Sequence, residues 1–197
     1  MAKDIIEFKI ELEGIKPKIW RIFQVESSIT FNELHKIIQK VMGWEDYHMY
    51  DFKAENTNII DSRSESFEQV LGRDIAKNEI KANKAKLFDF IKNKGQKVTY
   101  MYDMGDSWEH KLTVKNIFEV DDSKKDFPVV IDGERACPPE DSGGIWGYEN
   151  LLEIQKDPEN PEYEEMIEDW LGEDFDPEYF DVDEVNKKFR RKKYKVK

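Results

Sequence analysis

Alternating apolar and charged residues dominate the start of the chain. Over residues 6–12, Ile, Phe and Leu occupy every second position and Glu or Lys the positions between, which predicts a strand with one buried face. Residues 14–17 supply Gly and Pro for a turn. Residues 19–25 then alternate again, with Arg21 on the same face as apolar side chains. The opening of the chain therefore predicts an antiparallel hairpin.

A capped helix is predicted next. Thr30 and Glu33 match the capping box, in which each side chain accepts a hydrogen bond from the other residue's backbone N–H. Apolar residues recur at helical spacing over residues 31–42, and Gly43 marks the end of the helix. A strand is predicted over residues 47–53. Hairpin, helix and strand in this order predict a β-grasp-like core.

A second hairpin is expected further along the chain. Residues 54–85 are polar and poorly periodic, which predicts an irregular excursion with a short helix near residues 67–71. A short helix over residues 86–91 then leads into strands over residues 97–103 and 107–119.

The register of this second hairpin follows from its apolar positions. A loop of three or five residues sets Tyr102 opposite Trp108 and Tyr100 opposite His110. A two-residue loop would set the apolar residues against polar ones, so we reject it. His110 is therefore expected on the inward face, between two aromatic residues.

The C-terminal third of the chain is predicted to be helical. Residues 129–132 predict one more short strand, and consecutive prolines and glycines exclude regular structure over residues 133–144. Apolar stripes at helical spacing then continue to residue 189. The predicted fold class is α+β, with a β-grasp-like hairpin-helix-strand core extended by a second antiparallel hairpin and a helical C-terminal third. We expect a single domain over residues 1–197, divided into segments 1–53, 54–85, 86–144, 145–189 and a basic tail, 190–197.

Composition excludes several classes of protein. Apolar residues make up 39% of the chain, which is too many for a disordered protein, and no apolar run approaches the roughly 18–20 residues of a membrane span. The N-terminus alternates like a strand and carries acidic residues, which is not typical of a signal or transit peptide. The single cysteine, Cys137, excludes an internal disulfide and fits a reducing compartment. We therefore expect a cytoplasmic globular protein without a membrane partner.

The net charge of −12 is unevenly distributed. Residues 121–186 contain 23 acidic and 4 basic residues, whereas residues 187–197 contain 8 basic residues and no acidic one. Because an acidic stretch repels phosphate, nucleic-acid binding is expected only through the basic tail, from Lys187 to Lys197. The same tail also complements the negative end of a last helix, which is the simpler interpretation.

Five groups of residues stand out together. They are GIKPKIWR at 14–21; ELH at 33–35 with MGWEDYH at 42–48; YMYDMGDSWEH at 100–110; DGERACPPED at 132–141 with GG at 143–144; and WLGEDFDP at 170–177. In this order they resemble the Ri-plasmid open-reading-frame-three-like family, whose members occur on plasmids, insertion elements and chromosomes. The resemblance covers nearly the whole chain. It implies a single α+β domain and no agreed activity.

Two features of the resemblance bear on chemistry. Some relatives carry a resolvase-like label, but a recombinase needs a nucleophile surrounded by several arginines, and the six arginines here form no such motif. Many relatives have a second cysteine where this chain has Ser142. A metal or redox site made of two cysteines is therefore not expected.

Three sets of side chains are candidates for chemistry. Asp103 and Asp106 occupy a hairpin tip, where they either bind a cation or supply ordinary turn chemistry. His48 and His110 stand near aromatic residues on predicted strands and offer nitrogen ligands for zinc. No two of the three histidines and Cys137, however, have the short sequence spacing of a zinc motif. Arg135, in the Cys-Pro-Pro loop, either clamps a carboxylate or lines a recognition pocket.

We predict a non-enzymatic binding module whose pocket lies between the second hairpin and the Cys-Pro-Pro loop and accepts a protein or small-molecule partner. The alternatives are a metal-dependent enzyme, a thiol enzyme with Cys137 as nucleophile and His110 as base, and a nucleic-acid accessory protein of mobile elements. The sequence assigns no catalytic residue, metal or cofactor. The residues predicted to line the pocket are Trp44, Asp46, His48, Tyr100, Tyr102, Asp103, Asp106, Trp108, His110, Arg135, Cys137, Glu140 and Asp141.

Overall fold

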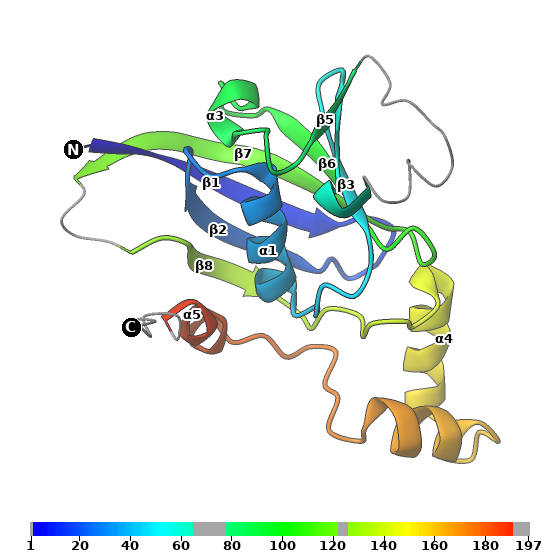
Figure 1. The fold of residues 1–197 in the computed structure, drawn as a ribbon. Helices are drawn as coiled ribbons and strands as arrows, with labels where there is room; N and C mark the ends of the chain where they lie inside the picture. The colour runs from blue at the N-terminus through cyan, green and yellow to red at the C-terminus, as the bar shows by residue number, and fades with distance from the viewer. Residues whose placement is uncertain (1, 65–77, 122–125, 191–197) are drawn as a thin grey trace, which may run out of the picture.

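One mixed sheet of eight strands organises the molecule (Figure 1). The computed structural model describes residues 2–64, 78–121 and 126–190. Within these residues the strand order is β5-β4-β3-β6-β7-β1-β2-β8, and all neighbours are antiparallel except β4 and β5. The strands are β1 (Ala2–Leu12), β2 (Trp20–Glu26), β3 (Tyr50–Ala54), β4 (Thr57–Ile60), β5 (Glu79–Lys81), β6 (Lys97–Tyr102), β7 (Trp108–Asp121) and β8 (Val129–Glu134).

Helices cover one face of the sheet and extend beyond its edge. Helix α1 crosses in front of β1 and β2, and α5 lies beside β8 (Figure 1). Helix α4 and the π-helical segment η2 pack on each other away from the sheet, around a small second core. No helix in the described part of the chain is long and apolar enough to cross a membrane. The helical segments are α1 (Phe31–Met42), η1 (Ser62–Ser64), α3 (Leu87–Phe90), α4 (Gly144–Gln155), η2 (Glu164–Leu171) and α5 (Val182–Arg190).

The predicted capping box at the start of α1 is confirmed. The Thr30 hydroxyl accepts a hydrogen bond from the backbone N–H of Glu33 at 3.2 Å, and the Glu33 carboxylate accepts one from the backbone N–H of Thr30 at 2.8 Å. Gly43 ends the helix in the left-handed conformation, at a φ of 114°.

Replacing Thr30 with alanine is expected to lower the free energy of unfolding by about 1 kcal/mol, since one amide of the first helical turn loses its acceptor. Urea denaturation measures the change. The control is Lys36→Ala on the exposed side of the same helix, which is expected to stay within about 0.5 kcal/mol of the parent protein. Equal losses in both variants would contradict the role of the cap.

The predicted register of the second hairpin is confirmed as well. Tyr102 pairs with Trp108, and Tyr100 pairs with His110. The face that carries these residues turns into the main core, where all four side chains are fully buried. Alternation therefore placed His110 on the correct face of the strand.

The predicted β-grasp-like core is wrong, because the second hairpin enters the middle of the sheet. In the described residues, β7 takes the free edge of β1, pairing Ala2 with Asp121 and continuing to Leu12 with His110. β3 pairs with β6 instead, and two strands, β6 and β7, separate it from β1. The hydrogen-bonding edge that a β-grasp strand would occupy is thus already filled.

The predicted helical C-terminal third is also wrong as a description of the fold. Strands account for 33% of the structure and helices for 29%, and turns or irregular segments separate α4, η2 and α5. Residues 54–85, predicted as irregular, contain β4 and β5, which extend the sheet. The short helix predicted near residues 67–71 lies outside the described residues, as do residues 191–197 of the basic tail.

Candidate functional site

Four of the predicted residues meet in space, although they come from three separate segments. His48 lies between α1 and β3, Asp103 begins the turn between β6 and β7, and Glu140 and Asp141 follow the two prolines. His48 Nε2 is 2.9 Å from Asp141 Oδ1, 3.7 Å from Asp103 Oδ2 and 3.9 Å from Glu140 Oε2. We call these four residues the carboxylate–histidine cluster.

Hydrogen bonds outside the cluster hold two of its carboxylates in position. Asp103 Oδ1 accepts a hydrogen bond from the backbone N–H of Gly105 at 2.8 Å. Glu140 Oε1 accepts one from the Tyr102 hydroxyl at 2.9 Å and one from the backbone N–H of Glu45 at 2.8 Å. Burial, with the contact to Glu140, raises the pKa of Tyr102, so its hydroxyl stays protonated and donates. In both carboxylates, the other oxygen faces His48.

The backbone at the cluster is unusual for residues that carry a side chain. Asp103 and Asp141 both have left-handed backbone, with φ of 55° and 56°. Each such residue costs of order 1 kcal/mol or more, although Asp tolerates the conformation better than most residues. These two turns place both aspartates beside the same imidazole.

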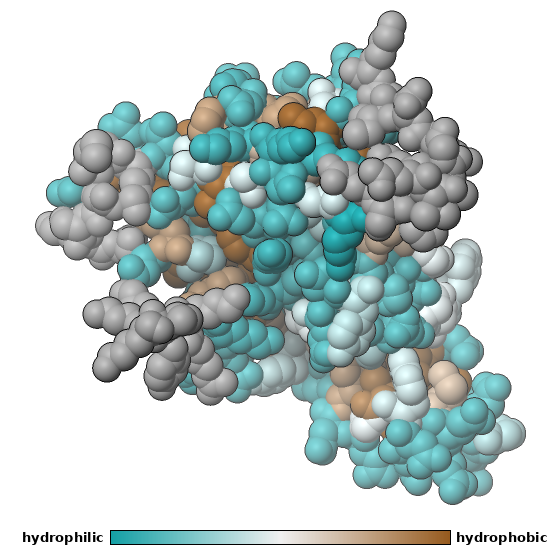
Figure 2. Space-filling view, viewed as in Figure 1, coloured by the Kyte–Doolittle hydropathy of each residue, from teal (hydrophilic) through white to brown (hydrophobic). Residues whose placement is uncertain are grey.

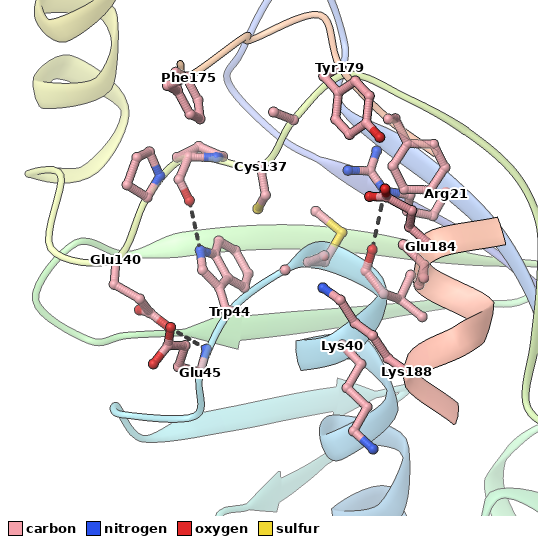
Figure 3. Close-up of a pocket in the computed structure, with 18 of the residues that line it drawn as sticks. Arg21, Lys40, Trp44, Glu45, Cys137, Glu140, Phe175, Tyr179, Glu184 and Lys188 are labelled. Atoms are coloured by element: carbon pink, nitrogen blue, oxygen red, sulfur yellow. Dashed lines mark hydrogen bonds between the residues drawn. The ribbon is translucent and has the colours of Figure 1, made fainter. Parts of the chain in front are cut away.

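A hollow of about 480 Å³ lies next to the cluster and shares Glu140 with it (Figure 3). We call it the aromatic hollow. Trp44, which donates from Nε1 to the carbonyl of Pro138 at 3.0 Å, fixes the Cys-Pro-Pro loop over one side. The end of α1, the Cys-Pro-Pro loop and the chain from η2 to α5 form its walls. Its aromatic lining residues are Trp44, Tyr47, Trp170, Phe175, Tyr179 and Phe180.

Arg21 forms part of the wall of the hollow, and its guanidinium is buried. It donates to four backbone carbonyl oxygens, and it stacks on the Phe180 ring at 3.7 Å. Burial lowers the pKa of Arg21 to about 10, which leaves the group charged at neutral pH. The four acceptors belong to Trp20, Val41, Glu134 and Arg135.

Cys137 also lines the hollow, but its thiol is not activated. Burial raises the pKa of the Cys137 thiol well above its ordinary value, and the nearby Arg21 guanidinium offsets this only in part. A thiol that stays protonated at neutral pH is a poor nucleophile. The predicted base, His110, is fully buried on β7 and does not line the hollow.

Three of the predicted residues are buried in the core and belong neither to the cluster nor to the lining of the hollow. Trp108 and His110 are fully buried, and the His110 ring lies edge-on against Trp44 at 5.0 Å. The Tyr100 hydroxyl lies 2.8 Å from Nδ1 of His35, which is also buried. These side chains support the site from behind and contact no solvent.

Three other predicted residues point elsewhere. Asp46 lies 2.8 Å from Nε2 of His35, outside the cluster. Arg135 forms the predicted carboxylate clamp, with Nη2 2.7 Å from Glu178 Oε1. Asp106 accepts a hydrogen bond from the backbone N–H of Gly143 at 3.0 Å, which attaches the hairpin turn to the start of α4.

Several residues of the hollow were not predicted from the sequence. Trp170 and Phe175 belong to a motif that carried the family resemblance, and that motif was the available signal. Arg21 gave another signal, because a charged residue stood on the apolar face of a predicted strand. Tyr179 and Phe180 lie in the acidic segment, which gave no signal for a hollow, and Tyr179 is 51% exposed.

The chain thus has one central mixed sheet, with a hollow between the end of α1, the Cys-Pro-Pro loop and the chain from η2 to α5. The chain belongs to the plasmid pRiA4b ORF-3-like protein family, whose model matches residues 4–184. It is 28% identical over 189 residues to "Uncharacterized protein y4hQ" of Sinorhizobium fredii (strain NBRC 101917 / NGR234), covering 95% of this chain and 91% of the relative. It is also similar to the crystal structure of MM3350, a protein of unknown function from Methanosarcina mazei Go1. That similarity has a TM-score of 0.78 and 39% identity, over 93% of this chain and 98% of the other.

Proposed function

We propose that the protein is a non-enzymatic binding module that accepts a small organic molecule in the aromatic hollow. The observation that carries the proposal is the shape and lining of the hollow: a volume of about 480 Å³ falls within the range of small-molecule sites, which are concave and mostly apolar with a few polar groups. Trp170 and Tyr179 are 44% and 51% exposed, so a ligand would bury aromatic surface that now faces water.

The hollow and the pocket predicted from the sequence share the Cys-Pro-Pro loop as one wall but differ in the opposite walls. The Cys-Pro-Pro loop contributes Cys137, Pro138 and Pro139 to the hollow, whereas α1 and α5 provide the opposite walls in place of the second hairpin. The hairpin contributes instead to the carboxylate–histidine cluster through Asp103. Binding is favoured over thiol chemistry because the Cys137 thiol stays protonated.

Fluorescence titration with N-phenyl-1-naphthylamine, a flat neutral aromatic probe, tests the hollow. We expect saturable one-to-one binding in the parent protein and about two- to tenfold weaker binding in Trp170→Ala, since one aromatic contact contributes about 0.5–1.5 kcal/mol. The titration is run in the presence of EDTA, so that its outcome does not depend on any metal ion.

The matched control for this titration is Trp146→Ala. Trp146 is 83% exposed on α4 and does not line the hollow, so its removal is expected to leave probe affinity unchanged. Absence of saturable binding in the parent protein, or an equal loss of affinity in both variants, would reject the aromatic hollow as a binding site.

A further inference from the structure

We propose that the carboxylate–histidine cluster binds one divalent transition-metal ion, with His48, Asp103 and Asp141 as ligands and Glu140 as a fourth. The cluster shares only Glu140 with the aromatic hollow. The proposal therefore does not depend on the binding function proposed for the hollow.

The distances within the cluster suit a common ion. Metal–nitrogen and metal–oxygen bonds of about 2.0–2.2 Å place neighbouring ligand atoms about 3.0–3.5 Å apart in tetrahedral or octahedral geometry. From His48 Nε2, the three carboxylate oxygens lie at 2.9, 3.7 and 3.9 Å. The ligand atoms of His48, Asp103 and Asp141 all lie within 4.8 Å of one another. The two longer distances from His48 Nε2 exceed this range by less than about half an ångström, so small side-chain rotations would bring these oxygens to the spacing from Nε2 that a shared ion requires.

Unpartnered atoms within the cluster point to a missing ligand. The Asp103 side chain is 9% exposed, and no hydrogen bond within the described chain reaches its Oδ2. Glu140 Oε2 has no exposed surface and no hydrogen-bond partner. His48 Nε2 is only 2.9 Å from Asp141 Oδ1, yet the two atoms are not aligned for a hydrogen bond. A buried acceptor without a partner is costly, and a cation at a shared point would satisfy all of these atoms.

The charges in the cluster lead to the same conclusion. Three carboxylates surround one imidazole, and in the described residues no lysine or arginine forms an ion pair with any of them. Like charges this close repel each other, and burial strengthens the repulsion between Asp103 and Glu140, whereas Asp141 is exposed. One divalent ion would remove most of this cost.

The outer contacts are those of an oriented metal site. Gly105 holds one oxygen of Asp103, and Tyr102 and Glu45 hold one oxygen of Glu140, which leaves the opposite oxygens facing His48. Hydrogen bonds of this kind hold the side chains that bind the ion in place and are typical of protein metal sites. A histidine nitrogen among the ligands favours Zn²⁺ over Ca²⁺ or Mg²⁺, which prefer oxygen ligands alone.

Isothermal titration calorimetry with ZnCl₂ on the full-length, chelator-treated protein tests the proposal. We expect one Zn²⁺ per chain, and we expect His48→Ala and Asp141→Asn each to weaken binding at least tenfold. The matched control is Asp106→Asn. Asp106 lies in the same turn as Asp103 but contacts Gly143 instead of the cluster. The variant should therefore bind Zn²⁺ as the parent protein does.

Two further measurements keep the test decisive. Thermal unfolding of each variant without metal shows whether it folds, and added Zn²⁺ should raise the unfolding temperature of the parent protein and of Asp106→Asn only. MgCl₂ should give no such shift. Zinc binding of unchanged affinity in folded His48→Ala, or no stoichiometric zinc binding by the parent protein, would overturn the proposal. Neither result would affect probe binding in the hollow, which is measured in EDTA.

Discussion

Replacing Arg21 with methionine is expected to lower the free energy of unfolding by about 3–5 kcal/mol. Methionine fills a similar volume but donates no hydrogen bond. The substitution therefore leaves four backbone carbonyl oxygens without their donor. Each buried, unsatisfied carbonyl costs about 1–3 kcal/mol, and removing the desolvation cost of the buried charge offsets part of the sum. The stacking contact with Phe180 is weakened as well.

The position of Arg21 explains why the loss should be large. Its guanidinium connects β2, the C-terminal end of α1 through the carbonyl of Val41, and the chain that leaves β8. Gly133 permits this approach, because a Cβ there would lie 2.6 Å from Arg21 Cδ and 2.9 Å from the carbonyl oxygen of Trp20. Arg21 thus joins the sheet to one wall of the hollow.

Urea denaturation of Arg21→Met against the control Lys156→Ala checks this prediction. Lys156 forms an exposed ion pair with Glu153, so its removal should change stability by less than about 1 kcal/mol. Arg21→Lys should lower the free energy of unfolding by nearly as much as Arg21→Met, since an ammonium group cannot match four fixed acceptors. A loss below about 1 kcal/mol in Arg21→Met would mean that the carbonyl oxygens have other partners.

Local features of the fold were predictable because they depend on residues close in sequence. The capping box needs only Thr30 and Glu33, and the hairpin register needs only the alternation on either side of the turn at Asp103. The sheet order was not predictable in this way. Alternation in β1 shows that one face is buried, but it does not show which strand takes each edge. The edge went to β7, more than a hundred residues away in sequence.

The candidate site was predicted in part for the same reason. His48, Asp103, Glu140 and Asp141 stand at the ends of strands or beside prolines, where polar side chains collect at one edge of a sheet. Trp108 and His110 were predicted to lie beside them, because alternation places both residues on the inward face of the strand. That face can line either a pocket or the core, and the alternation of apolar and polar residues is the same in both cases. The chain beyond Trp170 decided where the hollow lies, and only the tertiary fold places it there.

Acidification from pH 7 to pH 5 is expected to destabilise the protein by about 2 kcal/mol through His110 alone. Burial lowers the pKa of His110 from about 6.5 to about 3, although hydrogen bonds to the backbone of Trp108 and Tyr100 oppose the shift. The unfolded chain therefore binds a proton as the pH falls below about 6.5, while the folded protein does not until about pH 3. Stability is lost across that interval, at up to about 1.4 kcal/mol per pH unit.

The variant His110→Asn separates this effect from that of other groups. Asn keeps a donor for the Trp108 carbonyl, which Nδ1 of His110 contacts at 3.0 Å, and it does not titrate. His35, whose pKa burial also lowers, is unchanged in the variant, so the difference in pH slope between the two proteins belongs to His110. Urea denaturation at pH 7, 6 and 5 measures the free energy of unfolding of both proteins. Between pH 7 and pH 5 the variant should lose about 2 kcal/mol less of it than the parent protein does. Equal slopes would mean that His110 has the same pKa in the folded and the unfolded protein, and NMR titration of the imidazole would then place that pKa near 6.5 instead of about 3.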